Sequence, residues 1–294
     1  MPQYRDLRIL TLLKELSETR ITKLRQARVS EAPAVYLVVK NDIERMRIFL
    51  DYYRRIGIKE FVVLDNNSDD GTSELLQEQD DVTLYWSDEV YTSLRRIIWL
   101  DLMLAENGLN KWCLVVDSDE FFTYENQKHK DIREFIAEVG GDTIGAMMVD
   151  MYPKGKLFCG NGENFMEDCR FCDKGPYWEE PGPYGAMIRG GPRLRVFNCN
   201  VCLLKRPLFY YGDDIFYAHS HYVLPVREVK VSAYLRHYKF VSEKDWSKVE
   251  SAVKMRNYAN GSSEYRRYKK GVSFYDEVIS KEWDGCIHLN CIQI

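Results

Sequence analysis

The sequence predicts an α/β fold in which helices flank a mostly parallel, Rossmann-like sheet. Between Ala34 and Asp150, short apolar runs alternate with segments whose apolar residues recur at helical spacing. Strands that alternate with helices are joined by right-handed crossovers, which give a parallel sheet covered on both faces. The chain has 294 residues, of which 45% are hydrophobic, so it can bury a large core.

The individual elements follow from these runs. Five apolar runs predict strands, namely AVYLVV (34–39), EFVVLD (60–65), VTLYW (82–86), WCLVVD (112–117) and IGAMMVDMYP (144–153). Helical spacing predicts helices over 43–53, from Gly71 onward, and over 94–105, where Gly108 closes the last of them. The pattern then dissolves between 154 and 192, which predicts a long loop insertion.

Two terminal segments are expected to flank the main domain. Residues 4–28 carry leucine and isoleucine at near-helical spacing among Arg and Lys, which predicts a basic amphipathic helix. Such a helix can pack on the domain, on a partner subunit of a homo-oligomer, or on an anionic membrane surface. We therefore divide the chain into an N-terminal helical extension (1–32), the main domain (33–224) and a C-terminal helical segment (225–294).

Composition excludes some classes of function. A formal charge of -4 argues against a nucleic-acid binder, which usually displays a basic surface. The sequence has no apolar run of membrane-spanning length and no signal peptide at its start, so we expect a soluble, cytoplasmic protein with reduced cysteines. Cys169-x-x-Cys172 and Cys199-x-x-Cys202 have the spacing of zinc knuckles, although buried free cysteines are the favoured interpretation.

Polar residues gather where three of the predicted strands end, and ligands bind at this edge of parallel sheets. The clusters are Lys40 to Asp42, Asp65 to Gly71, and Asp117 to Glu120. Asp117-x-Asp119 places two carboxylates where Mg²⁺ or Mn²⁺ could be held against a diphosphate. The alternative interpretation is a solvated turn that caps the next helix.

Three of these segments carry a resemblance to a known family. VVLDNNSDDGTSELL (62–76) resembles the nucleotide-binding turn of glycosyltransferase family two and its relatives of the GT-A type. VYLVVKNDIERMRIFLDYYRRIGI (35–58) resembles their opening strand and helix, and CLVVDSDEFF (113–122) resembles their DxD strand. VDMYP, RGGPRLRVFN, KRPLF, SHY and LRHYKF are similar to a bacterial branch of these enzymes.

The resemblance implies a metal-dependent transfer of a sugar from a nucleotide-sugar donor, UDP-linked by analogy, to a glycan or glycolipid acceptor. It implies a role in bacterial surface polysaccharide synthesis. The expected location is the cytoplasm, and the basic N-terminal helix leaves the inner face of the membrane open as the place of work. It implies that Asn41, Asp65 and Asp117 contact the nucleoside, that Asp119 takes Mn²⁺ or Mg²⁺, and that His221 or His237 supplies a late histidine ligand. The sequence lacks the Q-x-x-R-W signature of processive synthases, so we expect single additions.

The candidate site residues can now be stated together. The donor-binding set comprises Lys40, Asn41, Asp65, Asn67, Asp117, Ser118, Arg193 and Arg195. The metal-binding set comprises Asp117, Asp119 and His221, with His237 as the alternative histidine. Arg193 and Arg195 follow a Gly-Gly-Pro turn on what is expected to be a short strand, where guanidinium groups suit a diphosphate or an anionic acceptor. Surface salt bridges are the competing explanation for both arginines.

Asp150 is the candidate catalytic base of an inverting transfer, because it interrupts an apolar strand at the donor edge. Asp213 and Asp214 are reserves, and a retaining mechanism stays open. Two rival functions remain. One is a haloacid dehalogenase-type phosphatase, for which Gly212-Asp213-Asp214 could be the late acidic motif; the other is a zinc-organised, noncatalytic binding protein. Stoichiometric zinc would favour the latter, and manganese-dependent use of a nucleotide sugar would favour the transferase.

Overall fold

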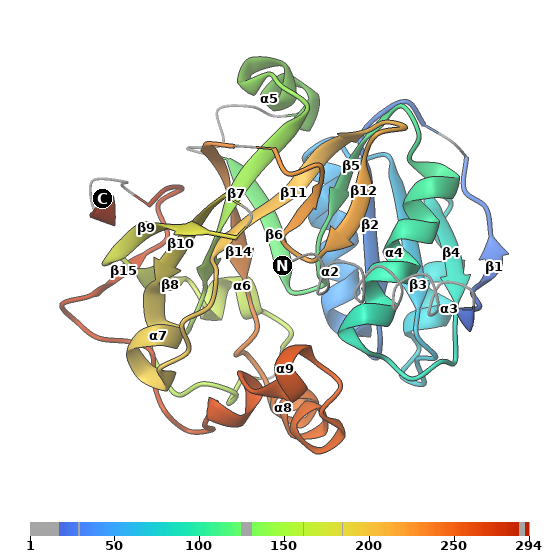
Figure 1. The fold of residues 1–294 in the computed structure, drawn as a ribbon. Helices are drawn as coiled ribbons and strands as arrows, with labels where there is room; N and C mark the ends of the chain where they lie inside the picture. Colours follow the sequence, from blue (N-terminus) through green and yellow to red (C-terminus); the bar gives the residue numbers. More distant parts are fainter. Residues whose placement is uncertain are drawn as a thin grey trace, which may run out of the picture.

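The computed structural model describes residues 18–28, 30–124, 131–160, 162–183, 185–227, 229–287 and 292–293. Its centre is a nine-stranded sheet (Figure 1). The strand order is β1 (Thr22–Arg25), β4 (Val82–Trp86), β3 (Glu60–Asp65), β2 (Ala34–Val39), β5 (Lys111–Val115), β11 (Leu204–Tyr211), β7 (Thr143–Asp150), β14 (Val231–His237) and β6 (Glu120–Tyr124).

Most strands of this sheet run in one direction. Strands β2, β3, β4, β5, β7 and β14 are mutually parallel, whereas β1, β6 and β11 run the opposite way. The predicted fold class, an α/β fold with a mostly parallel sheet flanked by helices, is therefore confirmed. The parallel strands all end at one edge, and the antiparallel strand β6 begins there.

Helices cover both faces of the sheet. Along β2, Val35 and Leu37 pack into the core that contains α2 (Ile43–Arg55), while Tyr36 points into a second core under α4 (Ser93–Asn107). This alternation is the two-residue period of a strand buried on both faces. The predicted helix after Gly71 is α3 (Thr72–Gln77), and Gly108 ends α4 as expected.

The later part of the chain adds smaller elements, some of which enclose a third apolar core. The helical ones are α5 (Ile132–Val139), α6 (Phe165–Asp168), α7 (Gly191–Phe197), α8 (Glu243–Met255), α9 (Ala259–Ser262) and the 3₁₀-helix η2 (Tyr265–Arg267). The strands are β8 (Phe171–Asp173), β9 (Tyr177–Gly182), β10 (Gly185–Gly190), β12 (Phe216–His219), β13 (Tyr222–Leu224), β15 (Ser280–Glu282) and β16 (Ile292–Gln293). The insertion at 154–192 thus contains paired strands and short helices, with β9 joined to β10 and β8 to β15.

Three assignments made from the sequence need correction. The segment 231–237 was expected to be helical, but it is strand β14, which lies inside the central sheet between β7 and β6. Arg193 and Arg195 lie on helix α7 and not on a strand, because Gly190 and Gly191 turn the chain at positive φ and Pro192 starts the helix. Residues 22–25 form the edge strand β1, where Leu24 is 46% exposed.

Most of the predicted N-terminal helix, together with its proposed membrane contact, lies outside the described residues. Within the described part of the chain, no helix combines the length and the apolar composition needed to cross a bilayer.

Candidate active site

Side chains from four strands meet at the edge where the parallel strands end. The loop between β5 and β6 carries Asp117, Ser118 and Asp119, and the last residue of β14 is His237. The sheet register places His237 opposite both Glu120, the first residue of β6, and Asp150, the last residue of β7. The backbone N–H of Tyr238 donates to the carbonyl oxygen of Asp119 at 2.8 Å, which fixes the loop against β14.

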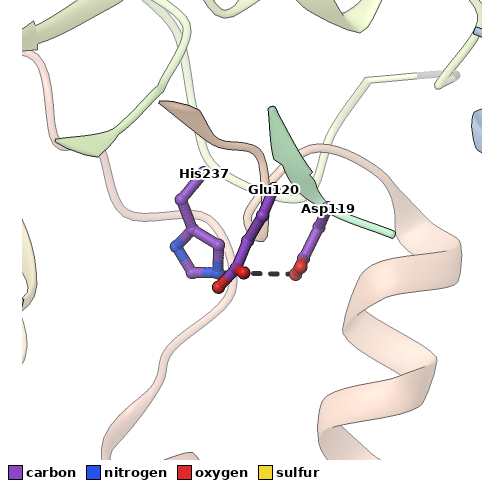
Figure 2. A group of neighbouring side chains, drawn as sticks. All are labelled: Asp119, Glu120 and His237. Atoms are coloured by element: carbon purple, nitrogen blue, oxygen red, sulfur yellow. Dashed lines mark ion pairs between the residues drawn. The ribbon is translucent and has the colours of Figure 1, made fainter. Parts of the chain in front are cut away.

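Among the described residues, one group has the geometry of a metal site. Ligand atoms of Asp119, Glu120 and His237 lie within 4.8 Å of one another, and their side chains converge from neighbouring strand ends (Figure 2). His237 Nε2 is 3.4 Å from Asp119 Oδ2. Two adjacent ligands of an octahedral Mg²⁺ or Mn²⁺ ion are about 3 Å apart, so this pair is spaced to share one ion. An imidazole nitrogen with a carboxylate oxygen suits manganese.

The neighbouring carboxylates have basic partners of their own. Arg96 Nη2 is 2.5 Å from Asp117 Oδ1, and Lys205 Nζ is 3.6 Å from Asp117 Oδ2. Lys205 also forms an ion pair with Glu120, whose side chain is 1% exposed. Burial opposes ionisation of Asp117, but the two cations hold its pKa below the usual value. Asp117 and Glu120 are therefore neutralised by basic side chains of the protein without a metal ion.

Among the described residues, Asp119 is the aspartate of this loop that is not paired with a lysine or an arginine. Its side chain is 20% exposed, against 38% for Asp117, and its ion-pair partner is His237. Burial opposes ionisation, but His237, Lys239 and Arg45 hold the pKa of Asp119 well below its ordinary value. An ionised, partly exposed carboxylate next to an imidazole fits a divalent cation better than Glu120, which Lys205 already occupies.

Asp150 contacts His237 at Nδ1, whereas Asp119 lies at the other ring nitrogen, Nε2. Its Oδ1 is 2.7 Å from His237 Nδ1, and its Oδ2 accepts from Arg193 Nε at 2.8 Å. Arg193 in turn pairs with Glu264 at 3.1 Å. Asp150 is 3% exposed and both of its oxygens are engaged, so the structure argues against the predicted role as catalytic base. The arrangement is that of a carboxylate that orients a histidine.

The other predicted site residues beyond β7 are also committed to internal contacts. Arg193 is 4% exposed, which keeps its guanidinium group from a donor; Arg195 is exposed, but its guanidinium group pairs with the buried Asp173 at 2.8 Å. His221 Nδ1 is 3.0 Å from the carbonyl oxygen of Leu204. Burial, with the nearby charge of Lys205, lowers the pKa of His221 to about 3. The geometry favours His237, not His221, as the histidine beside Asp119.

The proposed nucleoside-binding loops lie at the same edge, after β2 and β3. Asn41 and Asp69 exchange two hydrogen bonds of 2.8 Å, which join the two loops. Asp65 is 1% exposed, and its carboxylate accepts from the backbone and hydroxyl of Ser68, so it shapes the turn. Lys40 donates to the carbonyl oxygen of Asn66 at 2.9 Å. Asn67, at φ 56°, is exposed. Their contacts with a donor remain predictions.

A buried ionic network that the sequence did not reveal joins α8 to this edge. Asp42 accepts from Ser118 Oγ at 2.6 Å and pairs with Lys248 at 3.1 Å and Arg45 at 3.2 Å. Arg45 also pairs with Asp245 of α8 at 2.9 Å. These residues are spread over about 200 positions of sequence, which is why helical spacing alone could not connect them.

The motifs behind the rival functions lie elsewhere. Asp213 and Asp214 are exposed on a turn after β11, where Asp214 pairs with Arg227 at 3.1 Å. Cys169, Cys172 and Cys199 are buried free thiols, Cys202 is half-buried, and none of the four joins a metal-binding group of described residues.

No protein-family model matches the sequence, and no curated protein matches it significantly. Solved structures similar to the chain include residues 1–349 of TarS from S. aureus, at 14% identity and a TM-score of 0.36, covering 80% of this chain and 68% of that one. The mannosyltransferase PcManGT from Pyrobaculum calidifontis, in complex with GDP-Man and Mn²⁺, shows 11% identity, coverages of 90% and 73%, and a TM-score of 0.37.

HddC from Yersinia pseudotuberculosis is also similar, at 12% identity and a TM-score of 0.35, covering 73% of this chain and 96% of that one. One of these three structures is described as a mannosyltransferase.

Proposed function

We propose that the chain is a metal-dependent glycosyltransferase that uses a nucleotide-sugar donor. The observation that carries the proposal is the pairing of Asp119 with His237 at the edge where the parallel strands end, at 3.4 Å. This pair would hold Mn²⁺ or Mg²⁺, and the ion would stabilise negative charge on the leaving nucleoside diphosphate. The loops after β2 and β3 lie at the same edge, which is where such sheets bind nucleotides.

The residues around this pair each have a proposed role in the site. Asp150 accepts a hydrogen bond from Nδ1–H of His237, which leaves Nε2 to face the ion. Arg96 and Lys205 balance Asp117, which then serves the nucleoside or the ion as the sequence resemblance implies. Ser118 fixes the loop through Asp42. By the same resemblance we propose a UDP-linked donor, a glycan or glycolipid acceptor, and single, inverting additions in bacterial surface polysaccharide synthesis.

The direct test titrates UDP, GDP and dTDP into the protein with and without Mn²⁺, by calorimetry. We expect one of these to bind with an affinity that Mn²⁺ raises at least tenfold, because the ion bridges the diphosphate to the protein. Asp119→Ala should abolish the manganese dependence and leave the thermal unfolding of the free protein nearly unchanged. Asp119 contributes a ligand and not core packing.

Asp213→Ala is the matched control, since it removes a carboxylate from an exposed turn. It should bind Mn²⁺ and nucleotide like the wild-type protein. Undiminished manganese-dependent affinity in Asp119→Ala would sink the assignment of the metal site. Failure of the wild-type protein to bind any nucleoside diphosphate in the presence of Mn²⁺ would sink the proposed function.

A further inference from the structure

A row of tyrosines lies beside the metal site and is not used by the proposed metal chemistry. The ring centroids of Tyr91 and Tyr258 are 5.0 Å apart, those of Tyr258 and Tyr265 are 4.6 Å apart, and those of Tyr265 and Tyr268 are 5.6 Å apart. Tyr91 precedes α4, whereas the other three follow α8. Two distant segments therefore build one aromatic surface.

Lys239 joins this surface to the metal site. It follows His237 by two residues, and its Nζ lies 3.0 Å from the Tyr265 hydroxyl and 4.6 Å from the centroid of that ring. Tyr258 follows Asn257, whose carbonyl oxygen accepts from the first residue of α4, and Arg96 in the first turn of that helix pairs with Asp117 at 2.5 Å. The row of tyrosines thus borders the loop that would hold the ion.

The row is held firmly in place. The backbone N–H of Ser93 donates to the carbonyl oxygen of Asn257 at 3.1 Å, and the Asn257 amide donates to the carbonyl oxygen of Tyr91 at 3.1 Å. These bonds fix the residue before Tyr258 against the start of α4. A surface fixed by two tertiary hydrogen bonds loses little further conformational freedom when a ligand binds.

Core packing accounts for Tyr268, which is 4% exposed within the third apolar core, but not for the other three tyrosines of the row. Tyr258 belongs to none of the three apolar cores found among the described residues, and Tyr91 and Tyr265 lie only at the margins of two of them. Tyr91, Tyr258, Tyr265 and Lys239 are all half-buried. Within the described chain, the Tyr258 hydroxyl has no hydrogen-bond partner. The Tyr258 hydroxyl and the exposed parts of these rings are accordingly available to a ligand that offers both apolar and polar surface, whereas the Tyr265 hydroxyl is bonded to Lys239.

We propose that Tyr91, Tyr258 and Tyr265, with Lys239, form the subsite for a sugar ring at the metal centre. A pyranose has one face of C–H groups, which packs on aromatic rings, and a rim of hydroxyls, which bonds to tyrosine hydroxyls and to an ammonium group. This inference rests on the proposed function. The ring belongs either to the donor sugar or to the terminal sugar of the acceptor, because both must reach the same diphosphate.

The test compares Tyr258→Leu and Tyr258→Phe with the wild-type protein. Tyr275→Leu is the control, because the ring of Tyr275 lies under Lys154 and against Phe171, apart from the row. Calorimetry with Mn²⁺ measures UDP, GDP and dTDP against UDP-glucose, UDP-N-acetylglucosamine, GDP-mannose and dTDP-rhamnose. A glycan array measures sugar binding without a nucleotide.

If the row binds the donor sugar, Tyr258→Leu weakens nucleotide-sugar binding at least tenfold and changes nucleoside diphosphate binding less than twofold. If it binds the acceptor, nucleotide-sugar binding is retained and glycan binding is lost. Tyr258→Phe, which keeps the ring, retains most of the affinity in either case. Equal loss of nucleoside diphosphate and nucleotide sugar would assign the row to the nucleobase and overturn the inference.

The absence of any Tyr258-dependent sugar binding in both assays also overturns it, whether or not nucleotides bind. If the wild-type protein binds no nucleoside diphosphate, that result counts against the proposed function, and the glycan array still decides the role of the row.

Discussion

The carboxylate of Asp150 links His237, the histidine of the proposed metal site, to the buried Arg193, and replacing it with asparagine separates positioning from catalysis. The amide in Asp150→Asn would keep the shape and could still accept a hydrogen bond from His237 Nδ1, which is 2.7 Å from Asp150 Oδ1. It would lose the negative charge. If Asp150 positions His237, Asp150→Asn should weaken Mn²⁺ binding; if Asp150 is the base, the same change should lower turnover and spare Mn²⁺ binding.

The structure sets the expected size of the effect. Loss of an outer partner of a metal-binding histidine typically lowers metal affinity by about 10- to 100-fold. Asp150→Asn also leaves Arg193 with Glu264 as its partner, and breaking one side of a buried ion pair costs about 3 kcal/mol or more. The retained hydrogen bond should keep the cost near that lower value. For a chain of 294 residues, we expect the melting temperature to fall by about 5 °C.

Two measurements on the same variant decide between the roles. Mn²⁺ affinity is measured in the presence of the nucleoside diphosphate, and turnover is measured over a wide range of Mn²⁺ concentration. For a positioning residue, excess Mn²⁺ should restore most of the turnover below the melting transition. Turnover that falls a hundredfold or more, with unchanged Mn²⁺ affinity and no rescue by Mn²⁺, would refute the positioning role and return Asp150 as the base.

Two further predictions concern stability. Arg45→Met should lower the free energy of unfolding by about 3 to 5 kcal/mol in urea denaturation, because it removes the buried ion-pair partner of both Asp42 and Asp245. The control is Arg47→Met, on the exposed side of the same helix, which should change the free energy of unfolding by less than about 0.5 kcal/mol. Burial raises the pKa of Asp101 to about 6, so ionisation between about pH 4 and pH 6 costs the folded state stability. Asp101→Asn can still accept a hydrogen bond from the Tyr217 N–H. This variant should therefore raise the free energy of unfolding by about 1 to 2 kcal/mol at pH 7.5 and by almost nothing below pH 4. An equal gain at both pH values would contradict this reasoning.

The first half of the fold was predictable because its signals are local. From β2 to β5, each strand is buried on both faces and reads as a continuous apolar run, and each helix shows its own period. Strand β14 was missed because VSAYLRH contains basic and aromatic residues that also fit a helix. Its neighbours in the sheet are β7 and β6, both distant in sequence, and this tertiary pairing decides its conformation.

The candidate site, like the fold, was predictable only where it depends on local sequence signals. The parallel strand ends alone bring Asn41, Asp65 and Asp117 to one edge, as expected from sequence. The line from Asp119 through His237 and Asp150 to Arg193 depends on the register between β7 and β14, which no local pattern specifies. Arg193 was assigned to donor binding for this reason. Its sequence context, after a glycine turn, does not reveal that its guanidinium group pairs with the buried carboxylate of Asp150.

The two aspartates of the DxD loop should consequently give different mutants, although their sequence context is nearly the same. Removing the carboxylate of Asp117 leaves Arg96 and Lys205 buried beside it with one fewer counter-charge, which destabilises the folded protein before any effect on substrate is considered. Removing that of Asp119 leaves His237 still paired with Asp150 at 2.7 Å. A loss of activity in an Asp117 variant is therefore ambiguous between fold and function. Asp119 is the residue at which the loss of a metal ligand can be measured with the least disturbance of the surrounding charges.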